Sequence, residues 1–281
     1  MEWRGRRESD NVEDRRGLTG GHYAIGGIGG LIIAVIIYFL GGDPSQVIDQ
    51  NPPDQYAQSS KASDPNDTLR SEIAVILADT EDVWDSLFTG MHKHYVDPKL
   101  VLFTGQTQAG CGFANSATGP FYCPADQKVY IDLSFFDELT SRFGAEGGDF
   151  AMAYVLAHEV GHHVQNLLGI SDKVDHLRSQ LGDKEFNKTS VKVELQADFL
   201  AGIWAHYDQK MKNILDSGDI EEALSAASAV GDDRLQKETQ GNVVPDSFTH
   251  GTSQQRMYWF KKGFTTGDLT QGDTFNDPSL N

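Results

Sequence analysis

The sequence predicts an α+β fold, and three observations support that class. From Thr68 onward, most segments have apolar residues at helical spacing, whereas only two short runs have strand character. Both strand-like runs precede the main helices, which is the order of an α+β fold rather than of alternating βαβ units. With 281 residues, the chain is long enough for one sizeable domain and its appendages.

The N-terminal segment, residues 1–21, is rich in charge but carries no net charge. Its five arginines are balanced by five acidic residues, so the formal charge of -18 arises from the rest of the chain. An acidic excess of this size argues against a nucleic-acid partner, because phosphates require a basic face. We therefore expect no binding of nucleic acid.

Residues 22–42 enclose the stretch YAIGGIGGLIIAVIIYFL, which is eighteen positions long and has no charge. A helix of roughly 20 such residues spans the hydrocarbon core of a bilayer. Arginines precede the stretch and no residue in 41–60 is basic, which predicts a cytoplasmic N-terminus. A cleaved signal peptide is the alternative, but no small-residue cleavage pattern follows.

The expected consequence is a single-pass anchor in the cell (inner) membrane, with the following domain on the periplasmic, extracytoplasmic side. Gly26 and Gly30 have the spacing through which small residues pair membrane helices, so weak self-association through this helix is also expected. Residues 43–67 are rich in Pro, Asp, Ser and Gln, a composition typical of a flexible linker. The folded domain is expected over 68–270, followed by a C-terminal tail at 271–281.

The elements of the domain follow in order along the chain. Thr68 is the expected cap of a first helix whose apolar residues extend to Phe88. Two strands are expected at 100–103 and 129–133, separated by a Gly-rich segment that holds both cysteines. Helices are then expected at 148–168, 190–215, 220–230 and 253–264.

The two cysteines, Cys111 and Cys123, are too few for a metal-thiolate cluster. Their separation allows a disulfide in an oxidising compartment, which the predicted topology supplies. We expect them to be bonded to each other and to bracket the Gly-rich loop.

The stretch AHEVGHHVQ, residues 157–165, contains three histidines and a glutamate on one predicted helix. His158 and His162 are four residues apart, so both project from one face and can bind a single metal ion. Glu159 adjoins the first ligand, where its carboxylate can take a proton from a metal-bound water. The alternative is a pair of hydrogen-bonded core histidines. His163 points to another face and receives no chemical role.

A third ligand is expected in VKVELQADFLAG, residues 191–202. Glu194 and Asp198 again lie four apart on one helical face, among apolar neighbours where unpaired carboxylates would be costly. A zinc ion held by Glu194 removes that cost, and Asp198 can accept a hydrogen bond from a ligand imidazole. The sequence thus predicts Zn²⁺ held by two histidines and Glu194.

In this arrangement, HEVGH followed by ELQAD resembles the HExxH…ExxxD pattern of the gluzincins, the thermolysin-like zinc peptidases. More closely, the chain resembles the bacterial family of putative neutral zinc metallopeptidases. The resemblance extends over WRGRRESDNVEDRRG (3–17), CGFANSATGPFYCPADQKVYIDLSFF (111–136) and PDSFTHGTSQQRMYWFKKGF (245–264). Phe199 departs from the pattern, where a small residue or Cys is expected. The resemblance implies a gluzincin-like fold with a zinc site.

The expected activity is hydrolysis of peptide bonds in a peptide or protein substrate, with Glu159 as general base. The strand at 129–133 is either the exposed sheet edge that pairs with the substrate or an ordinary core strand. Two other functions stay open: a catalytically inactive, membrane-anchored binding module with a structural zinc, and a zinc hydrolase acting on a non-peptide amide.

Two further site residues are expected in SFTHGTSQQR, residues 247–256. His250 is the candidate donor to the developing oxyanion, a role that the resemblance supports through a similar stretch in a related zinc peptidase group. Arg256 is expected to orient the loop of His250 or to hold an acidic partner. The alternative for His250 is a helix cap or a surface loop.

Overall fold

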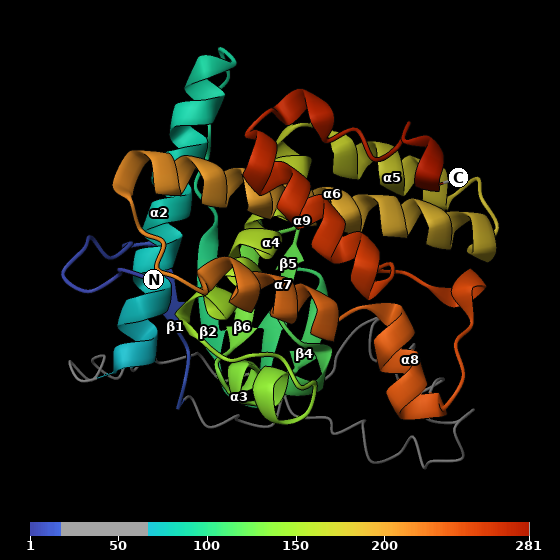
Figure 1. The fold of residues 1–281 in the computed structure, drawn as a ribbon, viewed down its shortest axis with the longest axis horizontal. Coiled ribbons are helices and arrows are strands. Elements are labelled where there is room, and N and C mark those ends of the chain that lie inside the picture. The colour runs from blue at the N-terminus through green and yellow to red at the C-terminus, as the bar shows by residue number, and fades with distance from the viewer. Residues whose placement is uncertain (18–66, 281) are drawn as a thin grey trace, which may run out of the picture.

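The computed structural model describes residues 1–17 and 67–280, which form eight α-helices, a four-stranded sheet and a two-stranded hairpin (Figure 1). The α+β class predicted from the sequence is confirmed. The helices are α2 (Thr68–Gly90), α3 (Ser134–Ser141), α4 (Asp149–Leu167), α5 (Ile170–Arg178), α6 (Asp183–Lys212), α7 (Asp219–Ala229), α8 (Asp232–Gln240) and α9 (Ser253–Thr266).

The boundaries of the five predicted helices follow the predicted periodicity with two corrections, whereas α3, α5 and α8 were not predicted. The side chain of Asp67 accepts the backbone N–H of Arg70, so Asp67 rather than Thr68 caps α2. Helix α6 begins at Asp183, well before the predicted start at 190. Its first turns are polar and partly exposed, so they lack the apolar repeat that marks a helix in a sequence.

The strands form a sheet of order β1-β2-β6-β5 and a separate hairpin, β3-β4. They are β1 (Val12–Asp14), β2 (Lys99–Phe103), β3 (Gln106–Ala109), β4 (Gly112–Asn115), β5 (Phe121–Cys123) and β6 (Lys128–Asp132). Strands β1, β2 and β6 are parallel, and β5 runs antiparallel to β6. Because β6 pairs on both sides, the interpretation of residues 129–133 as an exposed edge is wrong, and among the described residues β1 and β5 are the edge strands instead.

Helix α4 lies at the centre of the fold, in contact with β5 and β6 on the sheet side and with α2, α6 and α7 elsewhere. Helices α6 and α9 cross closely (Figure 1) because glycines face each other at the crossing. A Cβ at Gly202 would lie 2.1 Å from the carbonyl oxygen of Phe260, and one at Gly263 would lie 2.1 Å from that of Phe199. This close contact fixes the C-terminal helix against the helix that carries the predicted third ligand.

Residues 1–17 pack against the rest of the fold rather than lying apart from it. The indole of Trp3 is buried in the main core, and its N–H donates to Asp149 at 2.9 Å. Arg6 pairs with Asp79 at 2.6 Å, and strand β1 adds to the free side of β2 in parallel register. We call the part of the fold that these residues cover, on α2, α4 and α6, the N-terminal docking surface.

This packing corrects the localisation expected from the sequence. A cytoplasmic N-terminus and an extracytoplasmic domain are incompatible with a common core that contains Trp3 and helices α2 and α4. In the ranges 1–17 and 67–280, no helix is long and apolar enough to cross a membrane. The predicted anchor at 22–42, with its self-association motif, and the linker up to residue 66 lie outside the described residues.

Candidate metal centre

Helix α4 presents the motif residues at the point where α6 crosses it. His158 and His162 lie one turn apart, and Glu159 follows the first of them. The helix is apolar on almost every side and is therefore buried, which holds these side chains against a packed core. Gly161 permits the crossing, because a Cβ there would lie 3.0 Å from the carbonyl oxygen of Ala197.

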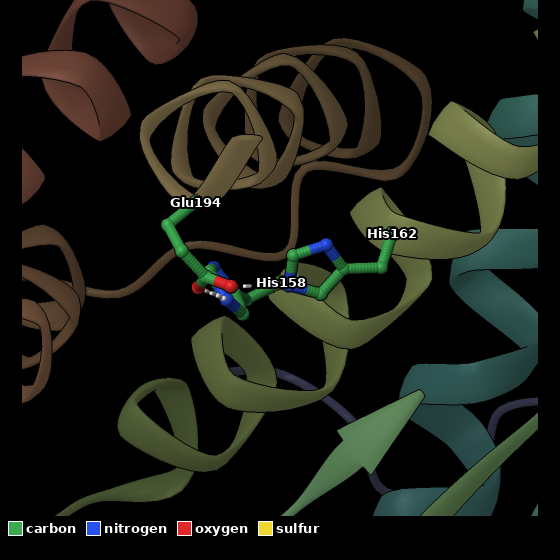
Figure 2. Close-up of side chains that lie close together, drawn as sticks. All are labelled: His158, His162 and Glu194. Atoms are coloured by element: carbon green, nitrogen blue, oxygen red, sulfur yellow. Dashed lines mark hydrogen bonds and ion pairs between the residues drawn. The ribbon is translucent and has the colours of Figure 1, made fainter. Parts of the chain in front are cut away.

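Glu194 reaches from α6 toward both imidazoles (Figure 2). Its Oε2 lies 3.2 Å from Nε2 of His158, and its Oε1 lies 3.5 Å from Nε2 of His162. One ligand atom from each of the three residues lies within 4.8 Å of the others. Two imidazole nitrogens and one carboxylate are a donor set that zinc favours in catalytic sites, so these residues fit the ion.

The orientation of His158 is set from behind by a buried carboxylate. Its Nδ1 lies 2.8 Å from Oδ1 of Asp198, which leaves Nε2 directed at Glu194. The hydroxyl of Tyr154 donates to the same Asp198 oxygen at 2.6 Å. Such a carboxylate fixes the ring and raises its basicity as a ligand.

Arg256 completes this arrangement from α9. Its Nε donates to Oδ2 of Asp198 at 2.8 Å, and its Nη2 donates to Oδ1 at 2.9 Å. Asp198 is fully buried and Arg256 is 4% exposed, so the pair is a two-point charged contact inside the core. Of the two roles predicted for Arg256, the structure shows contact with an acidic partner.

His162 is oriented by a different residue, Gln165. Its Nδ1 lies 2.9 Å from Oε1 of Gln165, and the amide of Gln165 donates to the carbonyl of Val193 at 2.8 Å. The glutamine is almost fully buried between α4 and α6. It therefore aims the second imidazole at Glu194 and at the same time ties the two helices together.

The charges of the cluster favour anionic carboxylates. Burial alone would raise the pKa of Asp198, but Arg256 and His158 lower it to about 2. Burial would likewise raise the pKa of Glu194, yet the two histidines hold it well below its usual range. Burial would lower the pKa of His158, but Asp198 and Glu194 raise it to about 10. The site thus attracts positive charge, which a proton or a metal cation can supply.

His250 lies on the same cavity and is held by Asp232, the first residue of α8. Oδ2 of Asp232 accepts three backbone N–H groups, from residues 249, 250 and 251, at 2.7–3.0 Å. Its Oδ1 lies 3.3 Å from Nδ1 of His250, and this hydrogen bond raises the pKa of the histidine. Asp232 therefore fixes both the turn and the imidazole that it carries.

The cluster opens into a cavity of about 590 Å³. One wall is formed by residues 116–124, which we call the β5 wall because they include strand β5. Cys111 and Cys123 form a disulfide, as predicted, and it brackets the chain that carries this wall. Other lining residues come from α3, α4, α5, α6, α8 and α9.

The structure brings together His158, Glu159, His162, Glu194 and His250 around one cavity. It also places Asp198 and Arg256 directly behind His158. Three contributing residues were not predicted. Tyr154 and Gln165 have a helical-spacing signal, four residues before His158 and three after His162, whereas Asp232 has none because its contact depends on how two distant segments fold.

Comparison with known proteins agrees with these observations. The family model described as "Putative neutral zinc metallopeptidase" matches residues 1–275. "Uncharacterized protein YpfJ" of Escherichia coli K12 is 52% identical, over 98% of this chain and 99% of its own length. "Uncharacterized protein Rv2575" of Mycobacterium tuberculosis H37Rv is 41% identical, over 86% of this chain and 85% of its own.

No solved structure matches the chain, so the gluzincin-like fold implied by the motif has no structural counterpart to support it. The family match, in contrast, covers the N-terminal segment, the metal helix and the C-terminal helix together. The chain therefore belongs to the family of putative neutral zinc metallopeptidases.

Proposed function

We propose that the protein is a zinc-dependent peptidase that hydrolyses peptide bonds. The observation that carries the proposal is the convergence of Nε2 of His158, Nε2 of His162 and the Glu194 carboxylate at the edge of an open cavity. A structural zinc site is usually closed by four protein ligands, whereas this cluster offers three among the described residues and faces a cavity.

The chemistry follows from where each group lies. A zinc ion bound by these residues supplies Lewis acidity, which polarises a carbonyl group and acidifies a water molecule. Glu159 lines the same cavity next to His158, where it takes a proton from the attacking water and passes it to the departing amine. Asp198 and Gln165 hold the two imidazoles in the orientation that this arrangement requires.

The proposed substrate is an extended peptide segment that lies along the β5 wall. Strand β5 pairs with β6 on one side and is the last strand of its sheet among the described residues. A peptide can add to such an edge through main-chain hydrogen bonds. Pairing with the substrate, which the sequence suggested for residues 129–133, is thus proposed for β5 instead, and β5 also lines the cavity.

His250 is proposed to donate a hydrogen bond to the developing oxyanion. It lies on the cavity that contains the metal ligands, and Asp232 fixes its ring through Nδ1. A donor held in place before the reaction needs no reorganisation when charge develops, which is why such donors stabilise transition states.

Two variants of the full-length protein test the proposal directly. Glu159→Gln should retain one zinc per chain and lose activity by about 10²–10⁴-fold, because it removes only the general base. Glu194→Ala should lose zinc as well as activity, because it removes a ligand. The measurements are zinc content by atomic spectroscopy and cleavage of a mixed peptide library, with and without chelator.

Three outcomes would count against this assignment. Equal loss of zinc in both variants would contradict the separate roles of Glu159 and Glu194. Zinc binding without cleavage of any library peptide would favour a binding module with a structural metal. Cleavage confined to non-peptide amides would favour the other hydrolase class.

A further inference from the structure

The third histidine of the motif, His163, has no part in the metal centre and faces the sheet. Its imidazole is fully buried, with Nδ1 3.0 Å from the hydroxyl of Tyr122 and Nε2 2.6 Å from the carbonyl oxygen of Val96. Its ring packs edge-on against Tyr95 and Tyr122, with centroids 5.7 Å and 5.4 Å away. A residue tied this firmly to Tyr122 acts on the β5 wall, because Tyr122 is the middle residue of β5.

We propose that His163 is a positioning residue that holds the β5 wall at a fixed distance from the metal centre. The inference rests on the proposed peptidase function, since it concerns where that peptidase holds its substrate. It assigns to His163 a role in substrate binding and not in the chemical step.

The direction of each hydrogen bond follows from the groups involved. The Val96 carbonyl can only accept, so Nε2 of His163 carries the proton, and in the neutral ring Nδ1 is then an acceptor. The Tyr122 hydroxyl donates to Nδ1, and its oxygen accepts the side-chain amide of Asn166 at 3.1 Å. The Tyr122 hydroxyl therefore donates one hydrogen bond to α4 and accepts another from it, so it has a single favoured orientation.

Helix α4 thus contacts two parts of the cavity lining. His162 lines the cavity itself, and the next residue, His163, contacts Tyr122 of the β5 wall. Strand β5 is only three residues long and pairs with β6 on one side, and its last residue, Cys123, is bonded to Cys111. These attachments join β5 to the sheet and to the hairpin, whereas the Tyr122 contact joins it to the helix that carries the metal ligands.

The experiment compares Tyr122→Phe, His163→Phe and the double variant in the zinc-loaded, full-length protein. Tyr122→Phe removes only the hydroxyl, and His163→Phe keeps an aromatic ring while it removes the acceptor for Tyr122 and the donor to Val96. Each single variant should raise KM for a peptide substrate about three- to tenfold, with kcat and zinc content unchanged. Amide hydrogen exchange of residues 116–124 should become faster in both.

The double variant is the sharpest part of the design. Since both substitutions break the same hydrogen bond, the effect of the double variant on KM and on exchange should be smaller than the sum of the two single effects. Tyr207→Phe is the matched control, because it removes a part-buried hydroxyl that donates to the carbonyl of Gly267 at 3.0 Å, away from the cavity. That control should leave KM and the exchange of the β5 wall at the parent values.

The inference is overturned if Tyr122→Phe leaves both KM and exchange of the wall at the parent values. Additive effects in the double variant would also overturn it, because they would show two independent contacts. If the parent cleaves no peptide, the proposed function fails, but the exchange measurement still decides the role of His163. Faster exchange confined to residues 116–124 then supports the positioning contact, and unchanged exchange excludes it.

Discussion

The metal centre and the N-terminal docking surface both bury acidic side chains, but their carboxylates are in opposite electrostatic states. In the metal centre, Asp198 accepts hydrogen bonds from Arg256 and Tyr154, lies against His158, and its pKa falls to about 2. At the docking surface, burial together with the nearby Asp149 carboxylate raises the pKa of Glu72 to about 7.

A second cluster at the docking surface shows the same imbalance. Asp79, Asp82 and Asp208 share Lys212, whose Nζ lies 2.7 Å, 2.7 Å and 3.6 Å from them. Burial and the Asp79 charge raise the pKa of Asp208 to about 7, and neither of its oxygens has a hydrogen-bond partner among the described residues. Arg6 from the N-terminal segment adds one positive charge at Asp79.

The difference shows that burial alone does not decide the charge of a carboxylate. Where cationic or hydrogen-bonding partners surround the group, as at Asp198, the anion is stable and the site can attract a metal. Where carboxylates outnumber their partners, as around Asp208 and Glu72, the protonated form is favoured over the anion. The stability of the metal centre is therefore expected to depend on its cationic side chains, and that of the N-terminal docking surface on pH.

The largest expected effect is at Arg256. Arg256→Met keeps the apolar stem but removes the guanidinium that makes two hydrogen bonds to the buried Asp198 carboxylate, and breaking a buried pair in this way typically costs about 3–5 kcal/mol in the free energy of unfolding. Denaturant unfolding of parent and variant measures it. Arg178→Met, which removes an exposed ion pair with Asp183, is the control and should change stability by no more than about 1 kcal/mol. A small effect at Arg256 would mean that Asp198 does not need the guanidinium to stay charged.

The next effect concerns turnover rather than stability. His250→Ala should lower kcat by about 10²–10³-fold with zinc content and KM nearly unchanged, because it removes a donor that acts in the transition state. Steady-state kinetics on a cleaved library peptide provide the measurement. Turnover at the parent rate would leave Glu159 as the only proposed catalytic residue beside the metal ligands.

Truncating Trp3 tests how much the N-terminal docking surface contributes to the free energy of unfolding. Trp3→Ala should cost about 3 kcal/mol in the free energy of unfolding, since it empties a buried site in the core and removes the hydrogen bond to Asp149. Leu69→Ala, at an exposed side chain of α2, is the control and should be close to neutral. If Trp3→Ala were equally neutral, residues 1–17 would contribute nothing to the stability of the fold.

The smallest effect is a pH dependence at Glu72. Its folded pKa of about 7 lies above the usual 4.5, so its contribution to stability is fully present below about pH 4.5 and is lost as the pH rises toward 7. Glu72→Gln cannot ionise and so removes this loss. The free energy of unfolding of the variant, relative to that of the parent, should therefore rise by about 2 kcal/mol between pH 5 and pH 8. Unfolding curves at the two pH values test this, and an identical pH dependence in both proteins would contradict the raised pKa.

Features that depend on local geometry could be predicted from the residues alone. Residues four apart on a helix share a face whatever the rest of the chain does, so spacing alone pairs His158 with His162 and Glu194 with Asp198. The helical periods at 68–88, 148–168 and 253–264 and the disulfide between Cys111 and Cys123 were confirmed for a related reason: each is visible within a short window.

How distant segments meet, in contrast, became visible only in the folded protein. Nothing in residues 1–17 indicates that Trp3 would enter the core or that 12–14 would pair with β2, because that strand is too short to show alternation. The same limit hid β5 as an edge strand, Asp232 as the partner of His250, and Tyr122 as the partner of His163. The last two contacts and the pairing of 12–14 with β2 join residues 18 to 88 positions apart, and their free energy depends on a packing arrangement that no local pattern encodes.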